Sequence, residues 1–282
     1  RDLKAYFRKE LLPIDIDSFS SISNTQPIQV QIENKEACPR YSGLLIKNIT
    51  VKSSPDWLQN RLKAIGIKPI NNIVDITNYI LHDLGQPLHA FDADKIEGNK
   101  IIVKTISKGT SFTTLDSVER KLNEFDLMIC DEKKPLAIAG VFGGLYSGVS
   151  SSTKNIFLES AYFSPSFIRK TAQAHALKTD ASFRYERGTD PRITIDALKK
   201  AAILIQKLAG GEITSIIDQY PNPISNVEIP ITYQQIWDLI GYPIEKKIIQ
   251  DILTHLDIEL KNKTEESFIA SVPPYRVDMS TT

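Results

Sequence analysis

The chain has 282 residues, 41% of them hydrophobic, and its 34 lysines and arginines balance 34 aspartates and glutamates. No apolar run approaches the roughly 18 to 20 residues that a membrane-spanning helix needs, so we expect a globular protein with no membrane association. Only two cysteines occur and nothing resembles a secretory signal, which predicts a reducing, cytoplasmic location. The zero net charge argues against a general nucleic-acid binder, so DNA is not an expected partner and any RNA contact must come from a local patch.

The chain opens at Arg1 without a methionine, and we expect it to be a piece of a longer protein, with residues 1–27 as a linker from a missing N-terminal region. Two prolines in the sequence Tyr-Pro-Asn-Pro at 220–223 cannot continue a helix, so they predict a domain boundary. Residues 1–223 carry 29 basic and 25 acidic side chains, whereas residues 224–282 carry 5 and 9. The neutral total therefore combines two domains of opposite charge.

The first part of the chain predicts two strands and then two helices. Alternating apolar residues predict a strand at 28–32, and residues 44–51 predict another after a turn at Cys38–Tyr41. Ser54 is the predicted cap of a helix that begins at Pro55 and ends before Gly66. Asn72 is the predicted cap of a second helix, which ends at Gly-Gln-Pro, 85–87.

The middle of the chain predicts mainly strands, and then helices return. Strands are expected at 101–106, 112–115, 127–130, 135–139 and 155–160. Helices are expected from Ser164 to about Ala176 and from Asp190 to Gly210. This pattern predicts an α+β domain over residues 1–223. In residues 224–282, a helix after Thr232, a second at 245–255 and strands at 257–260 and 268–272 predict a partial, winged-helix-like small domain.

Few side chains could hold a metal ion or act as a nucleophile. The four histidines lack the i, i+4 spacing of a helical metal site and the two cysteines are 92 positions apart, so no metal site is predicted. Glycines cluster at 139–144 after a predicted strand, which indicates either tight packing or a main chain that approaches a ligand closely. A nucleotide-binding P-loop is not predicted, because Leu-Tyr follows where Lys-Ser/Thr is required.

Two sets of polar residues are candidates for a binding pocket. Thr77, Asn78 and His89 lie on or just beyond an apolar helix, where they indicate either structural hydrogen bonds or a polar pocket. Glu159 interrupts an apolar strand, so its carboxylate lies at a solvated edge or is buried for a function. Arg-Tyr-Glu-Arg at 184–187 lies in a locally basic segment that includes Lys178, and it indicates an ion-pair lattice or arginines that meet phosphates beside a stacking tyrosine.

Five ordered blocks together resemble the β subunit of bacterial phenylalanyl-tRNA synthetase. They are NNIVDITNY at 71–79, GQPLHAFD at 85–92, AGVFGG at 139–144, LESAYF at 158–163 and TDASFRYERG at 179–188. The resemblance is strong over about residues 30–220, and the sequence VPPYRVD at 272–278 resembles the start of the next small domain in that family. The chain is thus interpreted as a fragment of the β subunit of phenylalanine-tRNA ligase, with an editing domain at 1–223 and part of a winged-helix-like domain at 224–282.

The resemblance implies a site that hydrolyses tyrosine wrongly attached to tRNA(Phe). A pocket shaped for phenylalanine cannot strongly reject a side chain that merely adds a hydroxyl group, so fidelity needs a second site. The family pattern implies that Glu159 accepts the phenol hydrogen bond, that His89 and the Gly140 main chain line the tyrosine pocket, and that Thr179 and Ala181 complete it. His89, Thr77 and Asn78 are the implied catalytic group, with a bound water as nucleophile; whether His89 is a general base or a pocket wall stays open.

The resemblance also implies partners. Lys178, Arg184 and Arg187 are the expected tRNA contacts, and the expected assembly is an α2β2 heterotetramer in which the α subunit carries aminoacylation with ATP and Mg²⁺. No cofactor is expected in this fragment. Two alternatives stay open: a non-catalytic scaffold and tRNA-docking module that supports the α subunit, and a stand-alone RNA-binding protein built around residues 184–192.

Overall fold

The structure is a computed structural model that describes residues 2–21 and 28–279, so residues 1 and 22–27 of the expected linker lie outside it. The described chain divides into a larger unit, residues 15–222, and a smaller unit made of residues 1–14 and 223–282. Within the described ranges, no helix is both long and apolar enough to cross a bilayer. The α+β class predicted from the sequence is confirmed.

The larger unit contains two five-stranded sheets. The first runs in the order β1-β4-β7-β8-β9, and in it only β1 (Gln29–Ile32) and β4 (Lys100–Thr105) are parallel. Its other strands are β7 (Leu127–Cys130), β8 (Pro135–Ile138) and β9 (Phe142–Gly143). The strands β5 (Ser111–Thr113) and β6 (Glu119–Lys121) form a separate hairpin, of which only the first strand was predicted.

The second sheet is antiparallel and has β10 (Ile156–Tyr162) between β2 (Arg40–Lys47) and β3 (Leu88–Asp92). The short strands β11 (Glu212–Ile213) and β12 (Ile217–Gln219) pair with β2. Every residue of β10 is buried, because both faces of this sheet are covered. The prediction of a strand at 44–51 was wrong at both ends: the strand begins four residues earlier, since the sequence around Cys38 that looked like a turn leads directly into a buried strand.

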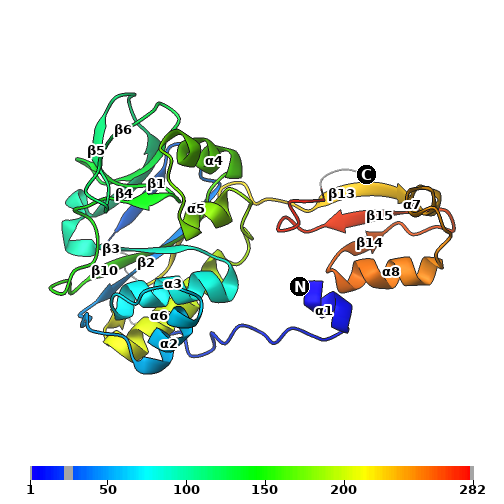
Figure 1. Ribbon diagram of the computed structural model, residues 1–282, viewed down its shortest axis with the longest axis horizontal. Coiled ribbons are helices and arrows are strands. Elements are labelled where there is room, and N and C mark those ends of the chain that lie inside the picture. The colour runs from blue at the N-terminus through cyan, green and yellow to red at the C-terminus, as the bar shows by residue number, and fades with distance from the viewer. Residues whose placement is uncertain (1, 22–27, 280–282) are drawn as a thin grey trace. The chain divides into compact units, whose positions relative to one another are not determined.

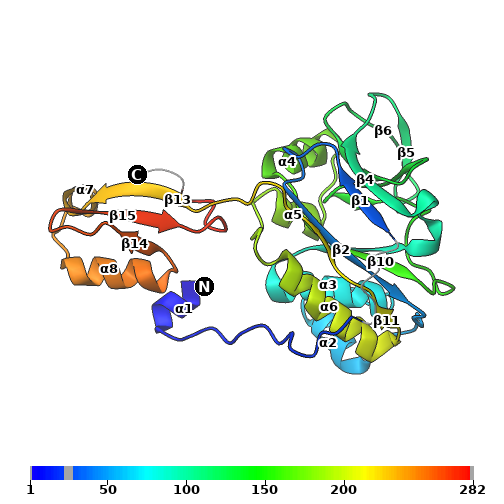
Figure 2. The same cartoon turned by 180° about the vertical axis from the view of Figure 1, so that it is seen from behind.

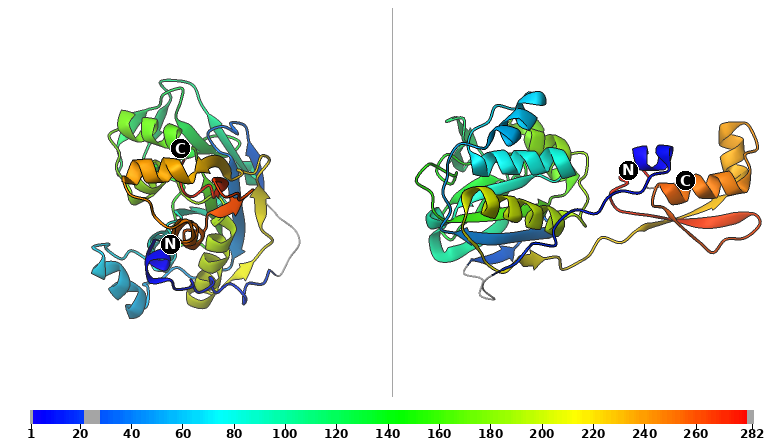
Figure 3. Two further views of the ribbon diagram at one scale, coloured as in Figure 1. Left: turned by 90° about the vertical axis from the view of Figure 1, so that its right-hand side faces the viewer. Right: turned by 90° about the horizontal axis from the view of Figure 1, so that it is seen from below.

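Helices cover one face of the second sheet and the first sheet lies toward the other. Figure 1 and the right view of Figure 3 show α3 (Asn72–Leu84) and α6 (Thr194–Ala209) as a layer over β2, β3 and β10. Alternate residues of β10 consequently enter different cores: Leu158 joins the core with α2 (Asp56–Ala64), α3 and α6, whereas Phe157 and Ala161 join the core between the sheets. Helices α4 (Pro165–Ala174) and α5 (Asp180–Tyr185) contribute to the inter-sheet core through Ile168 and Tyr185.

Three helix starts differ from the prediction. The cap of α3 is Asn71 and not Asn72, since the Asn71 side chain accepts from the N–H groups of residues 73 and 74. Ser54 does not cap α2, because its hydroxyl donates to the buried carboxylate of Asp75 at 2.5 Å. The long helix α6 begins at Thr194, four residues after the predicted start at Asp190.

The smaller unit is a three-stranded antiparallel sheet with helices. Its strand order is β13 (Val227–Thr232), β15 (Ser267–Val272), β14 (Glu259–Lys261), and β13 was not predicted. Helices α7 (Tyr233–Ile240) and α8 (Lys246–His255) follow β13, as Figure 2 shows. Residues 2–7 form α1 instead of the expected linker, and Lys4 of this helix contacts Asp257 at 2.6 Å.

Candidate functional site

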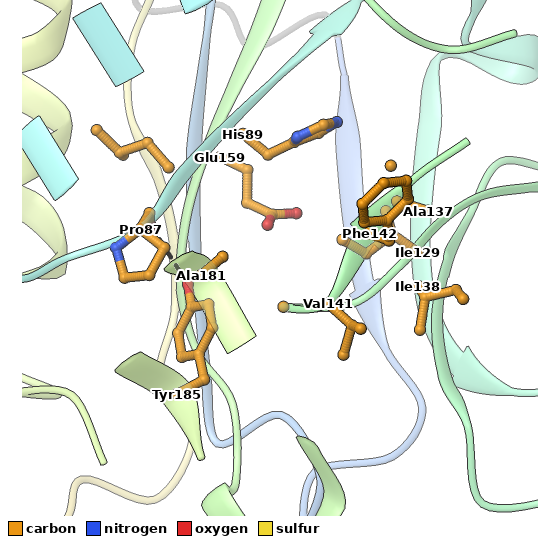
Figure 4. A pocket seen from close by; sticks show the side chains of 13 residues that line it. Pro87, His89, Ile129, Ala137, Ile138, Val141, Phe142, Glu159, Ala181 and Tyr185 are labelled. Carbon is orange, nitrogen blue, oxygen red and sulfur yellow. Dashed lines mark hydrogen bonds between the residues drawn. The ribbon is translucent and has the colours of Figure 1, made fainter. Parts of the chain in front are cut away.

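A pocket lies on the face of the second sheet that is turned toward the first sheet, and it brings together residues from β3, β10, the β8–β9 turn and α5 (Figure 4). Its cavity volume is about 80 Å³, several times the roughly 10 to 15 Å³ that one water molecule needs. The lining is mostly apolar: Pro87, Leu88, His89, Ile129, Ala137, Ile138, Gly140, Val141, Phe142, Gly143, Glu159, Ala181 and Tyr185.

The register of β3 and β10 places the two ionisable pocket residues side by side. Glu159 lies directly opposite His89 in this antiparallel pair. Directly opposed residues share one face of a sheet, with their Cβ atoms about 4.5 to 5.5 Å apart. Figure 4 shows the Glu159 carboxyl group pointing into the pocket, with the His89 ring next to it.

Glu159 is a buried carboxyl group with one protein partner. Its side chain is 4% exposed, and the hydroxyl group of Tyr41 donates to Oε2 at 2.6 Å. Burial raises the pKa of Glu159 to about 8, although the hydrogen bond from Tyr41 acts in the opposite direction. The sequence left open whether Glu159 lies at a solvated edge or is buried, and the structure shows that it is buried and lines the pocket.

His89 has an unused ring nitrogen. Among the described residues, Nε2 of His89 is one of four buried side-chain polar atoms without a hydrogen-bond partner. Burial lowers the pKa of His89 to about 4, so the imidazole is neutral at pH 7. The edge of its ring contacts Phe91 at a centroid distance of 4.4 Å. A neutral imidazole with a free nitrogen in a pocket can accept or donate one hydrogen bond to a bound molecule.

Glycines allow the β8–β9 turn to form one wall of the pocket. Gly140 has φ +67°, and a Cβ atom built there would lie 2.9 Å from ring carbons of both Phe163 and Tyr185. At Gly143 a Cβ atom would lie 2.8 Å from Leu115 and 3.1 Å from His89. The glycines therefore serve tight packing, and at the same positions the main chain reaches the pocket.

The six-residue helix α5, which was not predicted, supplies the opposite wall. Thr179 begins it with a capping box: its side chain accepts from the Ser182 N–H, and the Ser182 hydroxyl accepts from the Thr179 N–H. The Thr179 hydroxyl also donates to the Val141 carbonyl oxygen at 3.0 Å. Thr179 thus does not line the pocket but ties the glycine turn to the helix that presents Ala181 and Tyr185.

Thr77 and Asn78 are not among the lining residues. Thr77 is 7% exposed and its hydroxyl donates to the Val74 carbonyl oxygen at 2.8 Å, a local helix bond. Asn78 is half-buried on the same helix, α3, whose apolar residues belong to the core on the other face of the sheet. The structure therefore brings His89, Glu159, Gly140 and Ala181 together but does not bring Thr77 or Asn78 into this pocket.

The basic segment around α5 divides between the surface and the core. Tyr185 is 2% exposed, so it cannot stack on a base as one reading of the sequence required. Phe183 is the exposed aromatic residue, at 47%, and the Arg187 guanidinium lies over its ring at 3.6 Å. Lys178 and Arg187 are exposed and Arg184 is half-buried, while Arg187 also pairs with Glu186.

Sequence reasoning missed Tyr41, whose hydroxyl group donates to Glu159, because its segment was interpreted as a turn. Within the part of the chain that the structure describes, no three His, Cys, Asp or Glu side chains gather as a metal site would require.

Comparison with known proteins defines the class to which this fold and pocket belong. The B3/4 domain family matches residues 37–210, more than half of the chain, and the chain belongs to this family. The tRNA synthetase B5 domain matches residues 229–282. The pocket lies entirely within the B3/4 match.

The relatives are more specific. The chain is 52% identical over 285 aligned residues to the phenylalanine–tRNA ligase beta subunit of Bacteroides fragilis, 46% to that of Porphyromonas gingivalis and 43% to that of Fusobacterium nucleatum. Each alignment covers 99% of this chain and 35% of the relative, so the chain spans about a third of their length. The resemblance predicted from the five sequence blocks is confirmed, and the chain corresponds to a fragment of such a β subunit.

A solved structure of an N-terminal fragment of the phenylalanyl-tRNA synthetase beta subunit from Pyrococcus horikoshii aligns over 98% of this chain and 75% of that one. Its identity is 15% and the TM-score is 0.48, which is too low to establish a shared fold.

Proposed function

We propose that the larger unit is an editing domain that hydrolyses tyrosine wrongly attached to tRNA(Phe). The observation that carries this proposal is the adjacent pair in the pocket: the buried Glu159 carboxyl group and the His89 imidazole with its unused Nε2, in otherwise apolar surroundings. A mostly apolar pocket into which one carboxyl group points is suited to a ring that bears one hydroxyl group. The family of the chain supports the same assignment.

Recognition of tyrosine rests on Glu159 in this proposal. A phenol hydroxyl can both donate and accept a hydrogen bond, and a carboxyl group can meet it in either protonation state. Phenylalanine has no such group, so its binding would leave a buried polar atom without a partner, which costs about 1 to 3 kcal/mol. Ala181 supplies a small wall, and the positive-φ turn at Gly140 lets the main chain line the space.

Hydrolysis then needs a group that takes a proton from the attacking water. His89 is neutral above a pKa of about 4, so its free ring nitrogen is available as a general base at neutral pH. The proton passes from water to Nε2 while the water oxygen attacks the ester carbonyl; as the C–O bond to the tRNA breaks, Nε2–H returns the proton to the ribose oxygen, which leaves as a hydroxyl group. Thr77 and Asn78 have no step in this scheme, because they lie outside the pocket lining.

The proposal extends to partners. The exposed Lys178 and Arg187 are suited to phosphates of the tRNA end, and the exposed Phe183 of α5 is suited to one of its bases. We further propose that the chain acts within a complete phenylalanine–tRNA ligase in the cytoplasm, with an α subunit as partner, and that ATP and Mg²⁺ are used by that complete enzyme. In the described ranges, no cluster of side chains is arranged for a metal ion.

Deacylation of tyrosyl-tRNA(Phe) tests the proposal. We expect the chain to hydrolyse this ester faster than phenylalanyl-tRNA(Phe), and His89→Ala to reduce the rate by about 100-fold or more. Glu159→Ala should reduce the preference for the tyrosyl ester. His255→Ala, in the smaller unit, is the matched histidine control.

If both His89→Ala and Glu159→Ala hydrolyse tyrosyl-tRNA(Phe) as the parent chain does, the assignment of the site is wrong. Binding of tRNA without any hydrolysis, in the parent chain as in the variants, would instead support the scaffold and tRNA-docking module.

A further inference from the structure

Tyr41 contacts the pocket residue Glu159 but does not itself line the pocket. Tyr41 lies on β2, where it is paired with Ala161, two residues along β10 from Glu159. It is fully buried, and its hydroxyl group donates to Oε2 of Glu159 at 2.6 Å. The residue of β2 directly opposite Glu159 is Gly43, which has no side chain, so Tyr41 is the residue of β2 that reaches the carboxyl group.

This hydrogen bond makes the two oxygens of Glu159 unequal. Because Oε2 accepts from Tyr41, a proton bound by the carboxyl group resides on Oε1. Below its pKa the group therefore offers an O–H donor at Oε1, and above its pKa it offers a charged acceptor there. In both states Oε1 is the atom left for a second partner.

We infer that Tyr41 is a positioning residue that gives the pocket its preference for a hydroxyl-bearing side chain. It does so by holding Oε2, so that Oε1 must be satisfied by whatever enters the pocket. The inference rests on the proposed editing function, and it assigns the choice between tyrosine and phenylalanine to a residue outside the pocket lining. A site built to bond a substrate hydroxyl rejects an analogue that lacks it, because its own polar group is left unpaired.

Other titratable groups near Glu159 add no charge at neutral pH. His89 across on β3 is neutral because burial lowers its pKa to about 4. Burial raises the pKa of Tyr185 from α5 and of Cys38, which precedes β2, so both stay protonated. Tyr41 is consequently the neighbour whose removal should change the behaviour of the carboxyl group most directly.

Tyr41→Phe tests this inference without a change of shape. In the ligand-free chain, the Glu159 carboxyl carbon is followed by ¹³C NMR between pH 5 and 10 and assigned with Glu159→Gln. We expect its midpoint to rise by about one pH unit in Tyr41→Phe, because a hydrogen bond to the charged form is lost. Calorimetry with tyrosine and phenylalanine should show the preference for tyrosine falling by about tenfold or more.

Tyr185→Phe is the matched control, since it removes another buried hydroxyl group at the same pocket. The Tyr185 hydroxyl donates to the main-chain oxygens of Pro87 and Ala161 and not to a carboxyl group. This variant should leave the Glu159 midpoint in place, whereas a merely structural role for Tyr41 would make the two variants alike.

An unchanged Glu159 midpoint in Tyr41→Phe, or an unchanged preference for tyrosine, overturns the inference. If the parent chain shows no preference for tyrosine, while Tyr41→Phe still moves the midpoint, the editing proposal fails and the control of Glu159 by Tyr41 stands.

Discussion

Replacing Glu159 by glutamine measures how strongly the fold opposes the charge of this side chain. Burial raises the pKa of Glu159 from an ordinary 4.5 to about 8. The folded state therefore keeps the proton at pH values where the unfolded chain has released it. The contribution of Glu159 to the free energy of unfolding is complete below pH 4.5 and is lost progressively as the pH rises toward 8. Glutamine does not ionise, but its side-chain oxygen can still accept from Tyr41.

The expected magnitude follows from that shift. Between pH 4.5 and pH 7 the free energy of unfolding of the parent chain should fall by about 3 kcal/mol, a loss that Glu159→Gln does not share. Above pH 8 this loss approaches a plateau of about 5 kcal/mol. The difference in free energy of unfolding between variant and parent should thus grow by about 1.4 kcal/mol per pH unit between pH 4.5 and 8.

Urea unfolding at pH 4 to 9 can follow this difference in the larger unit alone. The two tryptophans lie in different units, Trp57 in α2 and Trp237 in α7. In a Trp237→Phe background, fluorescence therefore reports the larger unit. The exposed Glu124, changed to glutamine, is the matched control. A difference between Glu159→Gln and the parent that is constant across this pH range would refute the reasoning.

Three further predictions concern stability and can be measured by the same urea titration. Gly140→Ala should cost about 2 kcal/mol or more and weaken tyrosine binding, because both its φ of +67° and the ring carbons at 2.9 Å oppose a Cβ atom. The control Gly66→Ala should show only the smaller backbone cost, since Gly66 has φ +81° but open space around it. Asn71→Ala should cost about 1 kcal/mol through loss of the α3 cap, and a change below about 0.3 kcal/mol would contradict that role. Asp126→Ala should cost about 3 kcal/mol, since the fully buried carboxylate accepts from His175 at 2.6 Å; equal stability of the variant would argue against that contact.

Sequence patterns were most informative where one helix or strand buries a regular stripe. The apolar spacing in α3 and the glycine after it identified that helix, but the choice between adjacent asparagines as its cap depended on which side chain faces the free N–H groups. The short helix α5 has too few residues to show a period, so it was missed. The strand at residues 40–47 was predicted four residues too late, because Pro39 precedes it and indicated a turn.

The candidate site was predictable in part. The polar pattern singled out His89, Glu159 and the glycine turn at 139–144, whereas Ala181 and the pocket role of Gly140 came from the resemblance to the family; all line one pocket. Tyr41 was not named, since its contact with Glu159 joins residues 118 positions apart and depends on strand pairing.

The register of β10 between β2 and β3 has a consequence for how this site can change. Residue 159 faces the pocket because it pairs with His89 on one side and Gly43 on the other. A slip by one position would turn the carboxyl group toward the helices and bring Leu158 or Ser160 to the pocket face. The same register that packs the two cores also assembles the site. An insertion or deletion of one residue within β10 would therefore disturb the core packing and the site together.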